Sequence, residues 1–297
     1  MYKSDDGGGG TQGQGTARRK KVTAPALRAQ KGGQPITMVT AYDYTMARLL
    51  DDAGVDALLV GDSLGMVVQG HSSTIPVSLE EIAYHCRAVA RGATSAHVVG
   101  DMPFMSYQIS PEQALTSAGR LIKEGAAESV KLEGGEEVAE HVMRIVRAGI
   151  PVMGHIGLTP QSVHALGGYR VQGKDDDAVN KLVADARALE QAGVFAIVLE
   201  AMPPDAADEV TQAVSVPTIG IGAGVGCDGQ VLVCYDLLGM TFGHTPRFAK
   251  RFAELGTGVR EAAAAFVRDV HNRDFPGPEN SYPSTRKRKA KLAVVRR

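Results

Sequence analysis

The sequence predicts an α/β fold, a (βα)8 TIM barrel in a single domain with disordered basic termini. The first observation is that five apolar runs of strand length each end in an ionisable residue. The second is a helix stop that recurs before a strand, at Ala53-Gly54-Val55, Ala148-Gly149-Ile150 and Ala192-Gly193-Val194. The third is length, because such a barrel uses about 250 residues and the chain has 297, with 44% hydrophobic content.

Alternating strands and helices can be located along the central part of the chain. The expected strands cover residues 36–40, 58–60, 97–101, 129–132, 151–153, 195–199, 217–221 and 230–234. The expected helices cover residues 45–52, 78–91, 110–124, 136–147, 176–191 and 205–214. Phe248–Leu255 and Val259–Val270 have the pattern of amphipathic helices that close the barrel. The alternation favours a parallel sheet.

Composition divides the chain into three parts. Residues 1–23 are Gly-rich and basic, with almost nothing apolar to bury, so we expect a disordered tail. Residues 24–276 form the expected catalytic barrel, and residues 277–297 a polar and then basic tail. The net charge is −1, but residues 1–21 carry five basic and two acidic side chains, and residues 285–297 carry seven basic ones and no acidic one. The part between them is therefore acidic, with a net charge of about −11.

Composition also bears on partners and location. An acidic body argues against nucleic acid as the main partner and fits a soluble enzyme that holds a cation. Cys86, Cys227 and Cys234 have neither the spacing of a metal site nor the even count of a disulfide scaffold, which favours a reducing compartment. Neither a signal-peptide pattern nor an apolar run near the 18 or so residues of a membrane span is found. We therefore expect a cytoplasmic protein without a membrane partner.

Polar side chains follow the expected strands at the edge where a barrel carries its active site. They are Asp62 and Ser63 after the second strand, Asp101 at the third, Lys131 and Glu133 at the fourth, His155 at the fifth and Glu200 at the sixth. Because the carboxyl ends of the strands meet on one face of a barrel, we expect these seven side chains to share one site.

The acids among them predict a metal site. Asp62 and Asp101 end neighbouring strands, and two carboxylates in one mouth repel each other unless a cation or a proton lies between them. With Glu133 they form an all-oxygen set suited to Mg²⁺, which keeps waters and leaves positions open for substrate. The alternative is that they are separate helix caps and surface ion pairs.

The remaining polar residues suggest roles in substrate binding and proton transfer. Lys131 lies two residues before Glu133, so both side chains project to the same face of their strand. Lys131 can neutralise a substrate carboxylate or an enolate, and a Schiff-base role stays open. His155 could donate to the same oxygen or be a structural residue. Glu200 is followed by apolar residues, and an apolar environment raises the pKa of a carboxyl group towards the range of a general base. The alternative is that Glu200 caps a helix.

Two loops are candidates for substrate binding. Residues 220–229 contain a literal GxGxxG at Gly224, Gly226 and Gly229. This run leads into a strand and not a helix, which argues against a dinucleotide site and favours a substrate loop. The long loop over residues 155–173 is typical of a lid or binding loop.

Several motifs resemble those of the ketopantoate hydroxymethyltransferase family, over residues 37–276. They are Thr40-Ala41-Tyr42-Asp43, Val60-Gly61-Asp62-Ser63, Val68-Gln69-Gly70, Asp101-Met102-Pro103-Phe104, Val130-Lys131-Leu132-Glu133-Gly134-Gly135, residues 154–162, Gly168-Tyr169-Arg170-Val171-Gln172-Gly173, Gly220-Ile221-Gly222-Ala223-Gly224 and Asp228-Gly229-Gln230. The basic and Gly-rich ends extend past the usual family boundaries, so nothing about them is implied.

The resemblance implies a (βα)8 barrel that transfers a hydroxymethyl group from 5,10-methylenetetrahydrofolate to 3-methyl-2-oxobutanoate through a Mg²⁺-stabilised enolate. The product is 2-dehydropantoate, in the first step of pantothenate biosynthesis. It further implies a homodecamer built as a pentamer of dimers, with C-terminal segments that help to bind one subunit to another.

The resemblance also implies a role for each site residue. Asp62 and Asp101 would ligate the metal, with Glu133 bound directly or through water. Ser63 and Lys131 would hold the keto-acid carboxylate, with His155 hydrogen-bonding nearby. Glu200 would be the base that takes the proton from C3.

Three alternatives remain open from the sequence. The first is a Mg²⁺-dependent C–C lyase of the phosphoenolpyruvate mutase and isocitrate lyase type, although the Lys-Lys-Cys-Gly-His-like loop of such lyases is missing. The second is a non-catalytic barrel that serves as a scaffold. The third is an RNA-associated protein that works through its basic tails, which would bind RNA in a salt-sensitive manner.

Overall fold

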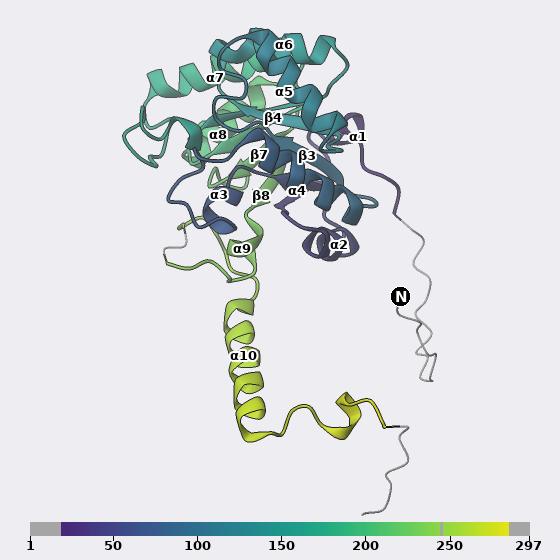
Figure 1. The fold of residues 1–297 in the computed structure, drawn as a ribbon. Coiled ribbons are helices and arrows are strands. Elements are labelled where there is room, and N and C mark those ends of the chain that lie inside the picture. The colour runs from purple at the N-terminus through teal and green to yellow at the C-terminus, as the bar shows by residue number, and fades with distance from the viewer. Residues whose placement is uncertain (1–18, 244–245, 285–297) are drawn as a thin grey trace, which may run out of the picture.

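A closed barrel of eight parallel strands forms the centre of the protein, in a computed structural model that describes residues 19–243 and 246–284 (Figure 1). The strands are β1 (Ile36–Thr40), β2 (Ala57–Val60), β3 (His97–Asp101), β4 (Ser129–Glu133), β5 (Val152–Gly157), β6 (Ala196–Glu200), β7 (Thr218–Ile221) and β8 (Gly229–Leu232). Each strand pairs with its neighbour in sequence, and β8 closes the barrel against β1. The predicted (βα)8 fold and its eight strands are confirmed.

Helices alternate with the strands, and most of them cover the outside of the barrel (Figure 1). They are α1 (Ala24–Arg28), α2 (Tyr44–Asp52), α3 (Leu64–Val67), α4 (Leu79–Gly92), α5 (Pro111–Lys123), α6 (Ala139–Arg147), α7 (Asp176–Ala192), α8 (Pro204–Ala213), α9 (Cys234–Leu237) and α10 (Leu255–Asn272), with short 3-10 turns at Glu136–Val138, Pro160–Ser162 and Pro278–Asn280. Among the described residues, no helix is long and apolar enough to cross a bilayer.

Local sequence explains most helix starts. Asp43, Ser78, Ser110 and Asp175 each accept a hydrogen bond from a backbone N–H in the first turn of the helix that follows, which satisfies a donor that has no partner inside the helix. At Ser78 the carboxylate of Glu81 also accepts from the Ser78 backbone N–H, which completes a capping box.

Strand boundaries differ from the prediction by more than one residue in two strands. β5 runs to Gly157, well past the expected end at residue 153, so His155 lies inside a strand. β8 ends at Leu232, because Cys234 already begins α9, and the Cys234 backbone N–H donates to Thr40 Oγ1 on β1. Both differences arise from pairing with neighbouring strands, which the apolar pattern of one segment does not reveal.

Of the two expected closing helices, the first was wrong, and the second forms a helix that does not close the barrel. Residues 248–254 form no helix, and α10 projects away from the barrel with no buried residue along its length (Figure 1). Its apolar side chains, among them Val259, Phe266 and Val270, remain exposed. An amphipathic pattern identifies an apolar face but not the surface that covers it.

The start of the described chain packs against the amino-terminal end of the barrel. Arg19 donates to the carbonyls of Gly54 and Val55, and Lys21 Nζ lies 2.8 Å from Glu128 Oε2. Residues 19–23, which the prediction included in a disordered tail, therefore make defined contacts. Residues 1–18 and 285–297, the rest of that tail and most of the C-terminal tail, lie outside the described residues.

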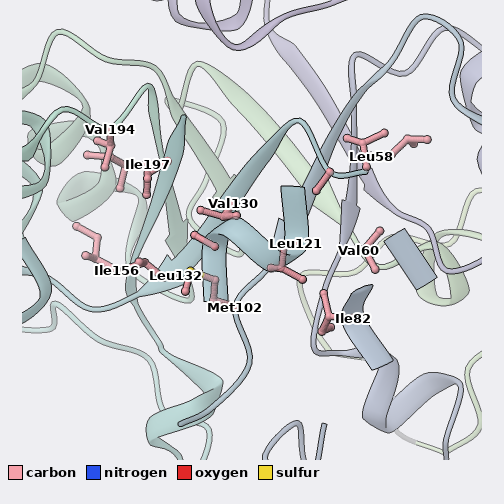
Figure 2. Packing of buried hydrophobic residues seen from close by; sticks show 14 of the residues in the cluster. Leu58, Val60, Ile82, Met102, Leu121, Val130, Leu132, Ile156, Val194 and Ile197 are labelled. Carbon is pink, nitrogen blue, oxygen red and sulfur yellow. The ribbon is translucent and has the colours of Figure 1, made fainter. Parts of the chain in front are cut away.

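Alternation along the strands separates two apolar cores. Leu58 and Val60 on β2 and Val130 and Leu132 on β4 belong to the cluster shown in Figure 2, which packs the strands against the covering helices. The residues between them point into the barrel, where Leu59 joins a second cluster with Val99 and Met153. The same period of two turns Asp101, Lys131, Glu133, His155 and Glu200 inward.

Glycine permits the close approach of α4 to α2. A Cβ at Gly92, the last residue of α4, would lie 2.6 Å from the carbonyl oxygen of Tyr44 and 2.9 Å from Ala47 Cβ. At Gly119, in the middle of α5, nothing lies within 4 Å of the same position. One helix glycine is therefore required by packing, and the other is not.

We expect Gly92→Ala to lower the stability of the fold by about 1–3 kcal/mol, because the methyl group forces backbone apart. The matched variant Gly119→Ala should raise stability by about 0.5–1 kcal/mol, because alanine is the better helix former. Thermal unfolding followed by circular dichroism measures both. Equal midpoints for the two variants would contradict this account of the α2–α4 contact.

Candidate active site

The seven candidate residues line one pocket of about 600 Å³ at the carboxyl ends of the strands. Strand register brings them together, because Asp101 pairs with Lys131 across β3 and β4, Glu133 with His155 across β4 and β5, and Gly157 with Glu200 across β5 and β6. Asp62 and Ser63 enter from the turn after β2. The structure therefore brings together every site residue that the sequence suggested.

Lys131 is the buried cation at the centre of this group, with only 4% of its surface exposed. Its Nζ lies 2.7 Å from Asp101 Oδ1, 3.2 Å from His155 Nδ1 and 4.0 Å from Glu133 Oε1. Burial favours the neutral amine, but the charges of Asp101, Glu133 and Asp62 outweigh it and raise the pKa of Lys131. Lys131 therefore stays an ammonium ion, which argues against attack on a carbonyl and favours binding of an anion.

His155 is neutral and held in one tautomer. Burial and the charge of Lys131 lower its pKa well below the usual range. Because the Lys131 ammonium can only donate, Nδ1 must accept, and the proton resides on Nε2. Nε2 lies 3.2 Å from Glu200 Oε2 but makes no aligned hydrogen bond within the described residues. A buried donor is thus directed into the pocket.

Asp62 and Asp101 form the expected pair of neighbouring carboxylates. The Asp62 backbone N–H donates to Asp101 Oδ2 at 3.2 Å, and both side chains are buried. Burial and the charge of Asp101 raise the pKa of Asp62 to about 7, against the lowering effect of Lys131. Asp101 Oδ1 makes no aligned hydrogen bond among the described residues, although it lies close to Lys131. The positive charge of Lys131 therefore does not balance the negative charge of these two carboxylates.

Glu133, the last residue of β4, belongs to the same cluster. Its Oε1 is 3.6 Å from His155 Nδ1, and its Oε2 accepts a 3.0 Å hydrogen bond from the Gln161 backbone N–H. Burial raises its pKa well above the usual value, and the neighbouring carboxylates of Asp62 and Asp101 add to this effect while Lys131 opposes it. A further positive charge in the pocket would therefore stabilise three acids at once.

The donor set suits a hard divalent cation. Mg²⁺ is commonly held by one or two protein carboxylates together with waters and substrate oxygens, and Asp62 and Asp101 supply such a pair. No group of three His, Cys, Asp or Glu side chains in the described part of the chain is arranged to hold a metal by itself. The proximity of the two buried carboxylates and the raised pKa of Asp62 both indicate that a cation fits between the two side chains.

Glu200 stands on the opposite side of His155 from Lys131. Its side chain is 15% exposed, and burial raises its pKa to about 7, with a smaller lowering effect from Lys131. A carboxyl group with this pKa is half ionised near neutral pH and can accept a proton there. Glu200 ends β6 and precedes the turn to α8, and Pro203 rather than Glu200 stands at the cap position of that helix.

Ser63 is fixed by a neighbouring phenol. Its Oγ lies 2.9 Å from Tyr42 OH, and burial raises the pKa of Tyr42, so the phenol keeps its proton. Ser63 then presents a hydroxyl at the start of α3, on the same wall as Asp62.

Two residues without an assigned role from the sequence organise the acids. Gln161 is 4% exposed, and its side-chain amide donates to Asp62 Oδ2 at 2.9 Å and to the Met102 carbonyl at 3.0 Å. Tyr107 OH donates to Gln161 Oε1 at 2.9 Å and contacts the backbone of Glu133. Gln161 belongs to a motif quoted above, whereas no sequence signal singled out Tyr107.

The two loops predicted to bind substrate contribute differently to the pocket. From the loop over residues 155–173, Leu158, Pro160, Tyr169, Arg170 and Val171 line the pocket, as expected of a binding loop. From the glycine-rich run, the pocket lining includes Ile221 at the end of β7, while a Cβ at Gly226 would meet Asp208 on α8. That run therefore packs mainly against a helix of the barrel wall.

A closed (βα)8 barrel with ionisable residues buried at the carboxyl ends of its strands is the architecture of a TIM-barrel enzyme. Within that class, the chain belongs to the ketopantoate hydroxymethyltransferase family, whose model matches residues 21–278. The match includes all seven candidate residues.

Curated hydroxymethyltransferases match this chain over nearly their whole length. A 3-methyl-2-oxobutanoate hydroxymethyltransferase of Anaeromyxobacter sp. (strain Fw109-5) is 56% identical over 285 residues, which cover 94% of this chain and 93% of the relative. That of Syntrophotalea carbinolica is 52% identical and covers 89% of this chain and 99% of the relative.

Solved structures share the fold at much lower identity. A phosphoenolpyruvate phosphomutase from Streptomyces platensis subsp. rosaceus matches with a TM-score of 0.56 and 14% identity, covering 86% of this chain and 92% of the other. A phosphonopyruvate hydrolase matches with a TM-score of 0.56 and 15% identity, covering 89% and 92%. At this identity the likeness shows the fold alone.

We expect Tyr107→Phe to cost about 1–3 kcal/mol of stability, because it leaves the buried Gln161 amide oxygen with a poorer partner. Tyr84→Phe is the matched control, since that ring is 62% exposed on α4 and should change stability by less than about 0.5 kcal/mol. Denaturant unfolding measures both. A Tyr107→Phe midpoint equal to that of the control would refute a structural role for the hydroxyl.

Proposed function

We propose that this chain transfers a hydroxymethyl group from 5,10-methylenetetrahydrofolate to 3-methyl-2-oxobutanoate, giving 2-dehydropantoate, the first committed step towards pantothenate. The observation that carries the proposal is the placement of Glu200, a partly buried carboxylate with a pKa of about 7, in one pocket with the Lys131 cluster. A base on one side and a group of anion- and cation-binding residues on the other are the parts that proton abstraction next to a carbonyl requires.

We propose Mg²⁺ as the resident metal, with Asp62 and Asp101 as its ligands and Glu133 bound directly or through water. Bound there, the ion supplies positive charge beside the keto group and so makes the C3 proton of the substrate more acidic. Support comes from the charge imbalance of the site, because three buried carboxylates and the partly buried Glu200 share one pocket with a single buried lysine.

Lys131 and Ser63 are proposed to hold the substrate carboxylate. Lys131 keeps its proton, so it offers a permanent positive charge, and Ser63 offers a hydroxyl fixed by Tyr42. His155 is proposed to donate its Nε2 proton to a substrate oxygen, since that donor lacks an aligned partner among the described residues. These contacts would orient C3 of the substrate towards Glu200.

Glu200 is proposed to take the C3 proton and leave the enolate. The one-carbon unit of the donor has the oxidation level of formaldehyde, so transfer forms one C–C bond, breaks both C–N bonds and uses one water as the source of the product hydroxyl. The proton balance closes when the tetrahydrofolate nitrogens are reprotonated. Glu200 is well suited to accept and return a proton because its pKa lies near neutrality.

The alternative of a phosphoenolpyruvate mutase or isocitrate lyase type of enzyme gains support only at the level of fold. The solved structures of that kind are at most 15% identical among those described above, whereas the hydroxymethyltransferases are 52–56% identical. A non-catalytic scaffold is disfavoured because the complete set of candidate residues is assembled in one pocket.

We further propose a homodecamer, arranged as a pentamer of dimers, that works in the cytoplasm. The exposed apolar side chains of α10 support a contact between subunits, because such patches commonly mark interfaces. The number of subunits rests on the family resemblance. The three cysteines are buried and unpaired, which suits a reducing compartment.

The enolisation step can be tested without folate. We expect the wild type to exchange the C3 proton of 3-methyl-2-oxobutanoate for deuterium in D₂O with Mg²⁺ and to lose this activity in EDTA. Glu200→Gln should slow exchange by about 10²–10⁴-fold, the usual contribution of a general base. Proton NMR of the substrate measures the rate.

Glu209→Gln, an exposed acid on α8, is the control and should exchange like the wild type. A folded, Mg²⁺-saturated wild type that exchanges no proton would refute both the base assignment and the proposed function. Exchange that survives Glu200→Gln at full rate would refute only the base assignment.

We expect the pH dependence of exchange to report the ionisation of Glu200. Since the carboxylate is the active form and its pKa is about 7, kcat/KM for exchange should rise with pH and reach half its plateau near pH 7. Asp62 titrates in the same range, but bound Mg²⁺ holds it ionised, so the measurement uses saturating Mg²⁺. A rate that falls as pH rises through 7 would contradict a carboxylate base.

A further inference from the structure

The pocket is larger than the keto acid requires. Its volume of about 600 Å³ lies within the range of sites that bury drug-sized molecules, about 300–1,000 Å³. 3-Methyl-2-oxobutanoate is a branched five-carbon acid, and the residues proposed to bind it all lie at the base of the pocket, on or directly after the strand ends. The remaining space extends outward between two loops.

The outer part of the pocket has a different chemistry from the base. Met66 comes from α3, and Tyr169 and Val171 come from the loop after β5, and all three line the pocket. They are 39%, 50% and 46% exposed, so apolar surface is left open to solvent at the entrance. Tyr169 OH lies 3.9 Å from Met66 Sδ, so the two loops meet across the mouth.

Tyr169 lines the same pocket as the ionisable residues at the strand ends. Burial raises its pKa, and the charges of Asp62, Glu200 and Glu133 add to this effect, as expected for a phenol that shares their pocket. A flat molecule that packs on this ring would therefore lie next to the substrate held at the base. The donor must occupy such a position for its one-carbon unit to reach C3 of the substrate.

Arg170 adds positive charge at the same entrance. It lines the pocket and its side chain is exposed, and it makes no ion pair within the described residues. Arg247 lines the rim as well. Lys131, by contrast, lies at the base of the pocket beside Asp101, where the keto acid is proposed to bind. An exposed arginine beside an apolar aromatic wall matches a ligand that joins flat rings to a carboxylate-bearing tail.

We infer that Met66, Tyr169 and Val171 form the subsite for the rings of the folate donor, and that Arg170 binds the carboxylates of its glutamate tail. This inference rests on the proposed function and adds to it a location and a specificity. A second glutamate adds carboxylate groups at the rim, so donors with a polyglutamate tail bind more tightly than the monoglutamate. The attraction between exposed charges weakens as salt is added.

The test compares two donors, 5,10-methylenetetrahydrofolate and its triglutamate, in the full-length Mg²⁺-loaded enzyme. The wild type should have a lower KM for the triglutamate. Arg170→Gln should raise the KM for the triglutamate by about three- to tenfold and remove most of the difference between donors, in line with the modest energies of exposed ion pairs. Arg170→Lys should retain part of the preference, and 0.5 M salt should reduce it in the wild type.

A second variant tests the subsite proposed for the folate rings. Tyr169→Leu should raise the KM for both donors by a similar factor, because it removes a stacking surface and leaves the tail site in place. Arg187→Gln, an exposed arginine on α7 outside the pocket, should leave both donor KM values unchanged. Circular dichroism checks that each variant is folded.

Two outcomes would overturn the inference. One is a wild type that does not distinguish the two donors, and the other is an Arg170→Gln variant in which the KM for 3-methyl-2-oxobutanoate rises as much as that for the donor. Deuterium exchange by the wild type is measured without any folate. Its absence would mean that the proposed function has failed, whereas normal exchange with unchanged donor KM values would mean that only the folate subsite is wrong.

Discussion

The structure of the site depends on one buried ammonium ion surrounded by carboxylates. Lys131 lies 2.7 Å from Asp101 and within reach of Glu133, and its proton is also directed at His155 Nδ1. Without this cation, the carboxylates at the base of the pocket would be buried with no positive charge to offset them, which proteins rarely tolerate. The charge also fixes the tautomer of His155, so that the nitrogen facing Glu200 carries the proton.

The single positive charge of Lys131 does not neutralise all the carboxylates around it. Burial and mutual repulsion leave Asp62 and Glu133 with raised pKa values even beside the ammonium ion. A stable fold that keeps such an imbalance favours the binding of a further cation, and this links the electrostatics of the free protein to the metal chemistry proposed for it. Gln161 and Tyr107 hold the acids in place through neutral hydrogen bonds, which fix geometry and leave the charge imbalance unchanged.

The base and the entrance of the pocket carry different kinds of side chain. Strand ends are rigid and carry the ionised groups, while the loops after β2 and β5 carry apolar and aromatic side chains at the entrance. A small anion can thus be held at the base, while a larger ring system packs above it. The loops lie on a scaffold whose eight strands are all paired, so the entrance can vary without loss of the catalytic geometry.

The sequence by itself determined the eight strands, the closed barrel and the seven residues of the pocket. It could do so because strand ends in a parallel barrel meet on one face, so that local patterns such as Val60-Gly61-Asp62 predict a shared site. Only the tertiary structure decided which atoms face one another. The tautomer of His155, the contacts of Tyr107 and the exposed course of α10 depend on packing between distant segments, and no local pattern encodes such distances.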